Sequence, residues 1–438
     1  MRKKLLAATV AGSVLAALTL FAAPPQQVTW QPPDPALVAR ARKILDRVPL
    51  VDGHNDVPWQ YRERVKNHLD KIDFAQDTSG LDPAMHTDIP RLRKGGLGGQ
   101  FWSVYIPVEI TGPAAVEAVL EQMDVVRRLA ARYPETFEMA MTENDVRRIH
   151  KAGRIASLLG MEGGHAIDNS LANLRQLYQA GARYMTITHS KNTDWADSAT
   201  DAPKHGGLTR FGEEVVREMN RLGMLVDLSH VSPLTMKKAL AVSAAPVIFS
   251  HSSARALNDH PRNVPDDVLA LVPKNGGVVM VTFVPTFDSE EVRGWNAGKD
   301  GEEARLKALH PDSPEGVKSE LAAWVQTHPE PRATLAQVAD HVDHVRQVAG
   351  VDHVGLGSDF DGITHTPVGL EGVAQYPVLL AELLRRGWTD AEIEKLAGGN
   401  VLRVLGEAER VAARLQKERP PSGARIEELD GPAVKSAM

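Results

Sequence analysis

The chain has 438 residues, of which 43% are hydrophobic and 24% are charged, a composition typical of a globular protein that buries a large core. Its formal net charge of −6 argues against nucleic-acid binding, which relies on a broad positive field. Cysteine is absent, which excludes disulfides, iron–sulfur clusters and thiolate zinc sites, so any metal must be held by His, Asp and Glu.

The N-terminus is typical of a secretory leader. Three basic residues at positions 2–4 precede an apolar stretch over residues 5–23, and two prolines follow. We therefore predict a signal peptide over residues 1–23 and an exported protein, periplasmic or extracellular. Phe21 stands where a small residue is usual, and the stretch is long enough to span a bilayer, so an uncleaved N-terminal anchor is the alternative. With no cysteine after the leader, we expect no lipoprotein anchor.

Residues 35–410 repeat one theme: a short apolar, β-branched run with a polar end, followed by a helical pattern. We count eight such runs: Leu50–Asp56, Gly99–Ile106, Ile155–Glu162, Tyr184–His189, Leu225–His230, Val247–His251, Gly277–Val284 and Val354–Asp359. Strands that alternate with helices pair in parallel, and eight of them predict closure into a single-domain (β/α)8 TIM barrel of the α/β class.

Several helices are predicted from their period or their caps. A short helix is expected near Leu37–Arg47, and apolar stripes predict helices over Ala115–Arg132 and Leu335–Val348, each with one face toward the barrel. Ser232 followed by Pro233 predicts a capped helix start, because Ser favours the N-cap and Pro the first helical turn.

Residues 285–332, rich in charge, Pro and Gly, interrupt this rhythm after the seventh strand and are too long for a simple loop. Because this insertion leaves the carboxyl end of a strand, we expect it over the barrel mouth, as a lid or as the subunit contact of a homodimer. Over residues 411–438 we expect one or two more helical turns and then, from Pro420, a mobile tail.

Six of the eight runs end in a metal ligand or an acid/base group, and these ends form the active face of such a barrel. The residues are His54, Asp56, Glu162, His189, His230, His251 and Asp359. His54 and Asp56 are alternate residues of an extended segment, so both can point into one cavity. The set suits two zinc ions that share one carboxylate and hold a hydroxide between them.

Each of these residues alone also has a structural explanation. Glu162 precedes two glycines and could start a tight turn, and a lone His after an apolar run is commonly a hydrogen-bonded core residue. His341 and His344 have metal-like spacing, but they flank the apolar stripe of a helix outside the barrel, so we predict that they face solvent. His165 is either a hydrogen-bond partner of the metal ligands or unrelated to them.

Seven segments, in order, resemble the renal (membrane) dipeptidase family of the metal-dependent hydrolase superfamily. They are Asp52–Asp56, Met161–His165, Thr188–Ser190 with Asn192 and Trp195–Asp197, Asp227–His230, Phe249–Ser253, Arg262–Asp267 and Gly357–Gly362. The resemblance runs from about Leu50 to Leu405. It implies a zinc-dependent metallopeptidase with two Zn²⁺ per chain, acting on small peptide substrates such as dipeptides, including those with a C-terminal D-amino acid.

The resemblance also implies a role for each site residue. One zinc would be bound by His54, Asp56 and Glu162, and the other by Glu162, His230 and His251. His189 would lie beside the substrate carbonyl and stabilise its developing charge. Arg262 would bind the substrate carboxylate, and Asp359 would shuttle a proton. Without the resemblance, a surface ion pair of Arg262 with Asp266 or Asp267 would be the simpler interpretation.

The chain also departs from the family. Animal members have disulfides and a lipid anchor, and neither is expected here because cysteine and an apolar C-terminal signal are lacking. The insertion at 285–332 is longer than the family suggests. Two alternatives stay open: another binuclear amidohydrolase, acting on N-acyl amino acids or on lactam-type amides, and an exported, non-catalytic zinc-binding protein. His and carboxylate ligands also accept manganese or cobalt.

Overall fold

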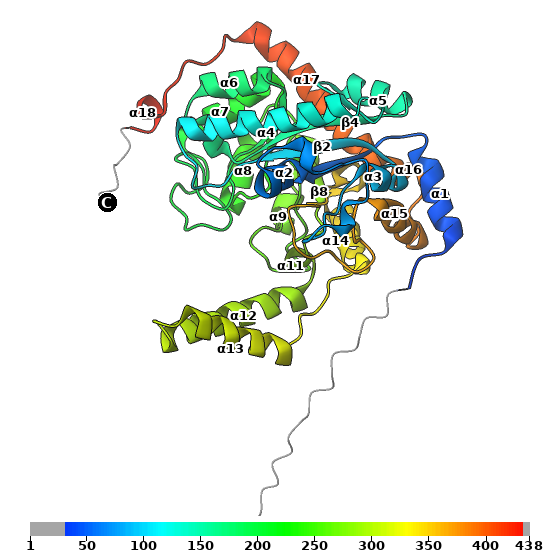
Figure 1. Ribbon diagram of the computed structural model, residues 1–438. Coiled ribbons are helices and arrows are strands. Elements are labelled where there is room, and N and C mark those ends of the chain that lie inside the picture. Colours follow the sequence, from blue (N-terminus) through cyan, green and yellow to red (C-terminus); the bar gives the residue numbers. More distant parts are fainter. Residues whose placement is uncertain (1–30, 432–438) are drawn as a thin grey trace, which may run out of the picture. The chain divides into compact units, whose positions relative to one another are not determined.

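The structure is a computed structural model that describes residues 31–431 (Figure 1). The predicted signal peptide, residues 1–23, lies outside the described residues. Between residues 31 and 431, no helix combines the length and the apolar character needed to cross a bilayer.

Eight parallel strands close into a barrel, which confirms the predicted (β/α)8 fold (Figure 1). They are β1 (Leu50–Asn55), β2 (Leu97–Tyr105), β4 (Ile155–Glu162), β5 (Ala182–Thr186), β6 (Leu225–Asp227), β7 (Ile248–Phe249), β8 (Val278–Val281) and β9 (Val354–Leu356). The order around the barrel is β2-β1-β9-β8-β7-β6-β5-β4, and pairing of β2 with β4 closes it. Nearly every strand residue is buried, because helices cover the outer face and side chains fill the interior.

One strand was not predicted. β3 (Phe137–Met139) pairs with residues 155–157 of β4, ahead of the segment 159–161 of β4 that pairs with β5. It has only three residues, of which Phe137 alone is fully buried. A run this short has no readable alternation, so its pairing depends on the neighbouring strand rather than on its own pattern.

The predicted helices are present with closely similar bounds. α1 spans Pro35–Leu45, α4 spans Pro113–Arg132 and α14 spans Leu335–Ala349. α8 (Pro233–Val242) begins after Ser232, whose side chain accepts a hydrogen bond from the Thr235 amide. Further helices around the barrel are α2 (Val57–Val65), α3 (Ile89–Gly95), α5 (Glu143–Lys151), α6 (Leu171–Gln179), α7 (Arg210–Leu222), α9 (Asp266–Leu269), α10 (Val272–Asn275), α15 (Tyr376–Arg385), α16 (Asp390–Glu394) and α17 (Asn400–Glu418).

The insertion at 285–332 is helical. α11 (Pro285–Asp288) is followed by a hairpin of α12 (Glu290–Leu309) and α13 (Pro314–Thr327), which projects from the barrel in Figure 1. The hairpin is held by packing between its own helices, with the rings of Trp295 and Trp324 6.0 Å apart. α11 contributes Phe287 to the barrel mouth. A role as lid or subunit contact stays a prediction.

The segment from Pro420, expected to be a mobile tail, is described as far as residue 431. α17 continues to Glu418, and a short helix α18 (Ile426–Leu429) follows. The carbonyl of Ser422 accepts a hydrogen bond from Arg175, and Asp430 accepts from Thr209 Oγ1 (2.6 Å) and from the Phe211 amide (3.1 Å). These contacts place residues up to 431 against α6 and α7. They are polar and specific, so the low apolar content of this segment gave no sign of them.

The structure contradicts the prediction that His341 and His344 face solvent. His341 is 1% exposed, its Nδ1 accepts a hydrogen bond from the Ala254 amide (3.0 Å), and its Nε2 donates to the Asp288 carbonyl (3.2 Å). His344 is half-buried and lies 2.8 Å from Asp266 Oδ1. The reason is that α11 and the segment after β7 cover this side of α14, which its apolar stripe does not reveal.

His341 should make stability depend on pH. Burial lowers its pKa to about 4 in the folded protein, whereas the unfolded chain has the ordinary value near 6.5, so the unfolded state binds more protons between these limits. Stability contributed by the neutral ring is therefore lost as pH falls from about 6.5 toward 4, by up to about 1.4 kcal/mol per pH unit.

Urea unfolding of the wild type and of His341→Gln, at about pH 7 and pH 5, checks this. The free energy of unfolding should fall less on acidification in the variant, which cannot titrate there. Equal pH dependence in both proteins would show that His341 does not take up the proton.

Candidate metal centre

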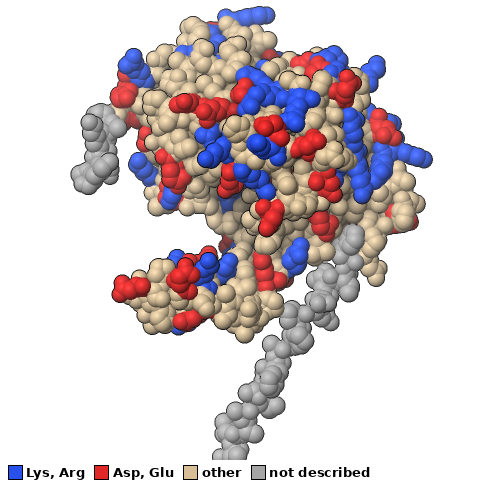
Figure 2. Space-filling view, in the orientation of Figure 1, with Lys and Arg blue, Asp and Glu red and all other residues tan. Residues whose placement is uncertain are grey.

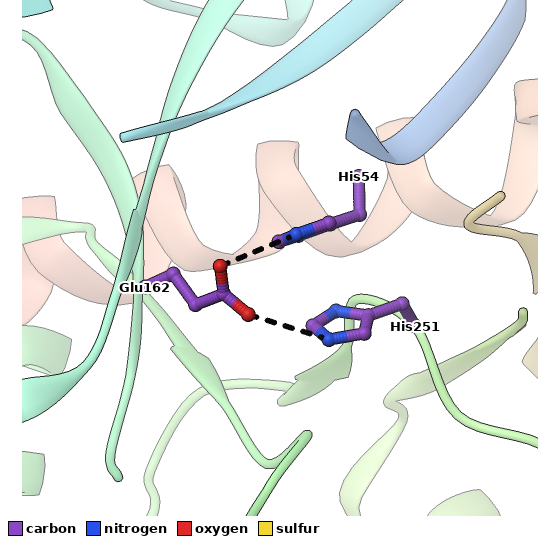
Figure 3. A group of neighbouring side chains, drawn as sticks. All are labelled: His54, Glu162 and His251. Carbon is purple, nitrogen blue, oxygen red and sulfur yellow. Dashed lines mark ion pairs between the residues drawn. The ribbon is translucent and has the colours of Figure 1, made fainter. Parts of the chain in front are cut away.

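Three side chains distant in sequence meet at the carboxyl end of the barrel. His54 lies on β1, Glu162 ends β4, and His251 follows β7. Figure 3 shows the two imidazoles facing the two oxygens of the carboxylate: His54 Nε2 is 3.5 Å from Glu162 Oε2, and His251 Nε2 is 3.6 Å from Oε1. All three side chains are buried. The convergence predicted from the strand ends is therefore present.

Two further histidines face the same oxygen of Glu162. His230 Nε2 lies 2.9 Å from Oε1 and 2.9 Å from His251 Nε2, and His189 Nε2 lies 3.7 Å from Oε1. One carboxylate oxygen thus faces three imidazole nitrogens, while the other faces His54. His189 is as close to Glu162 as His251 is, although the family resemblance assigns it to substrate rather than to metal.

Two aspartates complete the cluster on the side of His54. Asp56 Oδ2 is 3.3 Å from His54 Nε2, and Asp359 Oδ1 is 4.0 Å from the same atom. Three groups of potential ligand atoms each lie within 4.8 Å of one another: His54, Glu162 and His251; Glu162, His189 and His230; and His54, Asp56 and Asp359. Glu162 belongs to two of these groups, as a bridging carboxylate would.

Two of the residues sit just beyond their strands in strained backbone. His230 has φ 69° and Asp359 has φ 65°. The left-handed region costs a residue other than glycine about 1 kcal/mol or more. Both residues lie three positions beyond the ends of their regular strands, since β6 ends at Asp227 and β9 at Leu356 rather than at the predicted ends.

Hydrogen bonds fix the tautomer of His54. Its Nδ1 is 2.9 Å from the hydroxyl of Tyr184, which is also 3.2 Å from the Gly53 carbonyl. A carbonyl can only accept, so the hydroxyl donates to Gly53 and accepts from Nδ1–H. When the ring is neutral, its lone pair then lies on Nε2, which has no hydrogen-bond partner within residues 31–431. Tyr184 fits because a Cβ at position 160, occupied by glycine, would lie 2.0 Å from its ring.

A similar relay orients His251. Ser250 Oγ donates to Asp227 Oδ2 (2.6 Å) and lies 2.8 Å from His251 Nδ1. Because the single hydroxyl proton goes to the carboxylate, Nδ1–H must donate to Ser250, which leaves the Nε2 lone pair facing the cluster. No role for Tyr184 or Ser250 was predicted from the sequence, and Asp227 was included only within a family motif. The one available signal was that Ser250 precedes His251.

The surroundings of His230, His251 and Glu162 favour the protonation states in which these side chains can bind a metal ion. Burial lowers the pKa of His230 and His251 well below the ordinary value, and the charge of Arg262 adds to this. Burial alone would raise the pKa of Glu162, but the positive charge of His54 and a hydrogen bond from His230 outweigh it and hold that pKa well below its usual range. Burial lowers the pKa of His54, but Tyr184 and the carboxylates of Glu162 and Asp56 outweigh it and raise that pKa well above its ordinary value. His54 therefore releases a proton when a divalent ion binds, whereas His230 and His251 are already neutral.

Asp359 differs from Glu162. Burial raises its pKa well above the ordinary value, and the neighbouring carboxylates of Asp56 and Glu162 add to this, with His54 opposing. A carboxyl group that exchanges its proton more readily near neutral pH is suited to acid/base work.

Arg262 is 3% exposed and lines the same cavity. Its guanidinium carbon lies 5.3 Å from the Phe287 ring centroid, and Nη2 donates to the His251 carbonyl (3.4 Å). Nη1 has no partner among the described residues. Burial lowers its pKa to about 10, so it keeps its charge at neutral pH. The surface ion pair with Asp266 or Asp267 is not formed, since these pair with a histidine and a lysine.

The cavity has a volume of about 300 Å³, which suits a ligand of a few residues at most. Its lining combines the cluster with aromatic side chains: Asp56, Trp59, Tyr105, Glu162, His189, His230, His251, Arg262, Phe287, Asp359 and Gly362. His165 is not part of it. Within residues 31–431 its Nε2 makes no hydrogen bond, so the structure does not support it as a partner of the ligands.

Tyr184→Phe tests the orienting hydroxyl. The variant should keep the fold but bind Zn²⁺ about 10- to 100-fold more weakly, as is typical when the hydrogen bond behind a metal-binding histidine is lost. Competition with a chromogenic chelator measures this affinity. Tyr178→Phe, at a partly buried tyrosine on α6 away from the cluster, is the matched control. Unchanged affinity in Tyr184→Phe would remove its assigned role.

The comparisons with known proteins agree with this geometry. The sequence model of the family described as membrane dipeptidase (Peptidase family M19) matches residues 38–419. The probable dipeptidase PvdM from Pseudomonas aeruginosa is 27% identical with a TM-score of 0.74, over 86% of this chain and 99% of that one. Dipeptidase AC, a metallopeptidase of family M19, is 26% identical with a TM-score of 0.66, over 82% and 98%.

A metallopeptidase from Rhodobacter sphaeroides, liganded with a phosphinate mimic of the dipeptide L-Ala-D-Ala, is 25% identical with a TM-score of 0.65, over 82% of this chain and 99% of that one. The family match covers most of the chain, and the cluster of buried His and Glu residues is able to bind metal. The chain therefore belongs to the membrane dipeptidase family and is a metal-dependent peptidase.

Proposed function

We propose that the protein is a binuclear zinc dipeptidase that hydrolyses the single peptide bond of small substrates with a free C-terminal carboxylate. The observation that carries this is the position of Glu162. One of its oxygens faces His54, and the other faces His230 and His251. A carboxylate between two sets of imidazoles matches a site for two ions better than a site for one.

The residues fit such a pair of ions. His54, Asp56 and Glu162 would hold one, and Glu162, His230 and His251 the other. All donors are nitrogen or oxygen, as zinc accepts, and the two relays leave Nε2 of His54 and of His251 free to coordinate. When bound, the ions would supply an activated water and polarise the substrate carbonyl. Manganese and cobalt also bind such donors. We propose zinc because the family resemblance implies it.

The remaining groups would act on protons and on substrate. Asp359, with its raised pKa, would accept a proton from the attacking water and deliver it to the leaving amine nitrogen. Burial lowers the pKa of His189, so a neutral ring would donate its N–H to the carbonyl oxygen as negative charge develops there. Neither step needs any residue outside the cavity.

Arg262 would select the substrate. It is a buried cation with an unused Nη1 at the cavity wall, and a guanidinium binds a carboxylate with two parallel hydrogen bonds. A dipeptide places its free carboxylate one residue from the scissile bond, whereas a longer peptide does not. The ligand of the Rhodobacter sphaeroides relative, a mimic of L-Ala-D-Ala, supports dipeptides as the class and extends the proposal to a C-terminal D-amino acid.

Export through the leader at residues 1–23 and assembly as a homodimer are further parts of this proposal. Each has support from the sequence alone.

Release of amino acids from a panel of dipeptides tests the function directly. Zinc-loaded protein should cleave dipeptides with L- and D-residues at the C-terminal position, cleave tripeptides far more slowly, and lose activity with a chelator until Zn²⁺ is restored. Turnover confined to N-acyl amino acids or to lactams would instead identify another amidohydrolase.

Asp359→Asn separates proton transfer from metal binding. Asparagine has nearly the same shape but cannot take up a proton, so kcat should fall by about 10² or more while the metal content stays near two ions per chain. Elemental analysis beside a dipeptide assay measures both quantities. Loss of metal in this variant would place Asp359 among the ligands.

Arg262→Gln should raise KM for dipeptides by about 10- to 100-fold, because a charge-assisted hydrogen bond to the substrate is lost. The same change should have little effect on the corresponding dipeptide amides, which lack the carboxylate. Arg403→Gln, a partly buried arginine on α17 that lies outside the cavity lining, is the control. An equal rise in KM for amides would contradict carboxylate recognition.

A further inference from the structure

A second hollow, of about 670 Å³, lies at the opposite end of the barrel from the metal centre. Its lining includes Pro49, Leu97 and Ile155, which stand where β1, β2 and β4 begin, together with residues of α1, α3 and α5. The metal centre occupies the carboxyl ends of the strands, so this hollow belongs to the amino-terminal face, away from the chemistry.

The lining of this hollow is strongly basic. It contains seven Arg or Lys residues and a single acidic residue, Asp46; the seven are Arg42, Arg47, Arg93, Lys94, Arg147, Lys151 and Arg154. The whole chain has a net charge of −6, so this is a local reversal of sign. Basic side chains gather at the right-hand edge of the molecule in Figure 2, over α1.

Part of this charge is not neutralised by the protein. Carboxylates of the chain pair with three of the seven cations: Arg47, Arg147 and Arg154. Within residues 31–431 no ion pair forms at Arg42, Lys94 or Lys151, and Arg93 donates only to a carbonyl and a hydroxyl. These four cations against Asp46 leave a net charge of about +3, in a region where like charges destabilise the fold unless an anion is bound.

The shape of the hollow indicates which anion. The floor is apolar, formed by Leu45, Pro49, Leu97 and Ile155, while the cations stand around it, most of them on exposed side chains. A free phosphate needs no apolar floor and no ring of cations from three helices. An anionic phospholipid offers phosphate to the rim and its glycerol ester region to the floor, and neighbouring lipids offer further phosphates.

In the sequence, the apolar segment best able to enter a bilayer shortly precedes α1, which lines this hollow. The apolar stretch ends at residue 23 and α1, which carries Arg42, begins at Pro35, so eleven residues (24–34) separate them. Even fully extended, eleven residues span at most about 40 Å. No other described helix follows that stretch so closely.

We propose that this basic hollow binds the headgroups of anionic phospholipids and docks the amino-terminal face of the barrel on a membrane surface. The strands run from the hollow toward the metal centre, so docking directs the active-site mouth away from the lipid, where peptides reach it from solution. The proposal does not depend on which substrate the metal centre cleaves.

Vesicle co-sedimentation of the full-length protein tests this. Binding to phosphatidylcholine vesicles that contain phosphatidylglycerol should exceed binding to pure phosphatidylcholine vesicles, and the difference should shrink with added salt. The apolar stretch over residues 5–23 is present with both vesicle types, so its contribution to binding cancels when the two are compared. The variant Arg42→Gln/Lys94→Gln/Lys151→Gln should reduce the partition onto anionic vesicles by about tenfold or more, because each cation near an anionic surface contributes roughly a factor of five.

The control is Lys204→Gln/Arg210→Gln/Lys318→Gln, which removes the same number and type of exposed cations from the loop after β5, the start of α7 and α13, away from the amino-terminal face. It should bind anionic vesicles like the wild type, and both variants should keep the activity of the wild type toward soluble dipeptides. An equal loss in the control, or no preference of the wild type for anionic vesicles, overturns the proposal. Tight binding of inorganic phosphate that the first variant abolishes, without vesicle preference, would identify a free anion as the ligand and overturn it as well.

Discussion

A single buried carboxylate sets the requirements for the rest of the site. Glu162 ends β4 inside a closed barrel, where an ionised group without partners costs several kcal/mol. Ser103 donates to one of its oxygens at 3.0 Å, and four imidazoles face it from the other strands. The barrel supplies these partners because its parallel strands deliver their carboxyl ends to one rim. The same convergence that stabilises the charge creates a place for divalent ions.

Behind the histidines, buried polar groups hold the ligand geometry. Asp227 orients His251 through Ser250, and Asp52 accepts hydrogen bonds from Ser358 Oγ and from the Tyr376 hydroxyl, each at 2.7 Å. Asp52 thereby ties β1, which carries His54, to the segment after β9 that carries Asp359. These networks are fully buried and leave each ligand few alternative rotamers, which is the preorganisation that a metal site needs. The opposite face of the barrel presents a group of exposed cations, so the two ends are suited to different partners.

The sequence predicted the barrel and the convergence of His54, Glu162 and His251, because a polar residue at the end of a buried strand is visible as a break in an apolar run. It did not predict contacts made across the fold. β3 is too short to show a period, His341 is buried by an insertion that its own helix does not reveal, and Asp430 makes hydrogen bonds to residues more than 200 positions away. The role of the Tyr184 hydroxyl could not be predicted for another reason. A tyrosine in a strand usually belongs to the hydrophobic core, and only the structure shows that its ring lies against the glycine at position 160.

A crystal structure of the zinc-loaded protein, with anomalous diffraction at the zinc edge, would test whether Glu162 bridges two ions. We expect two peaks about 3.5 to 4 Å apart, one beside His54 and Asp56 and the other beside His230 and His251, with a carboxylate oxygen of Glu162 on each. A single peak, or two peaks with Glu162 turned away from them, would contradict it.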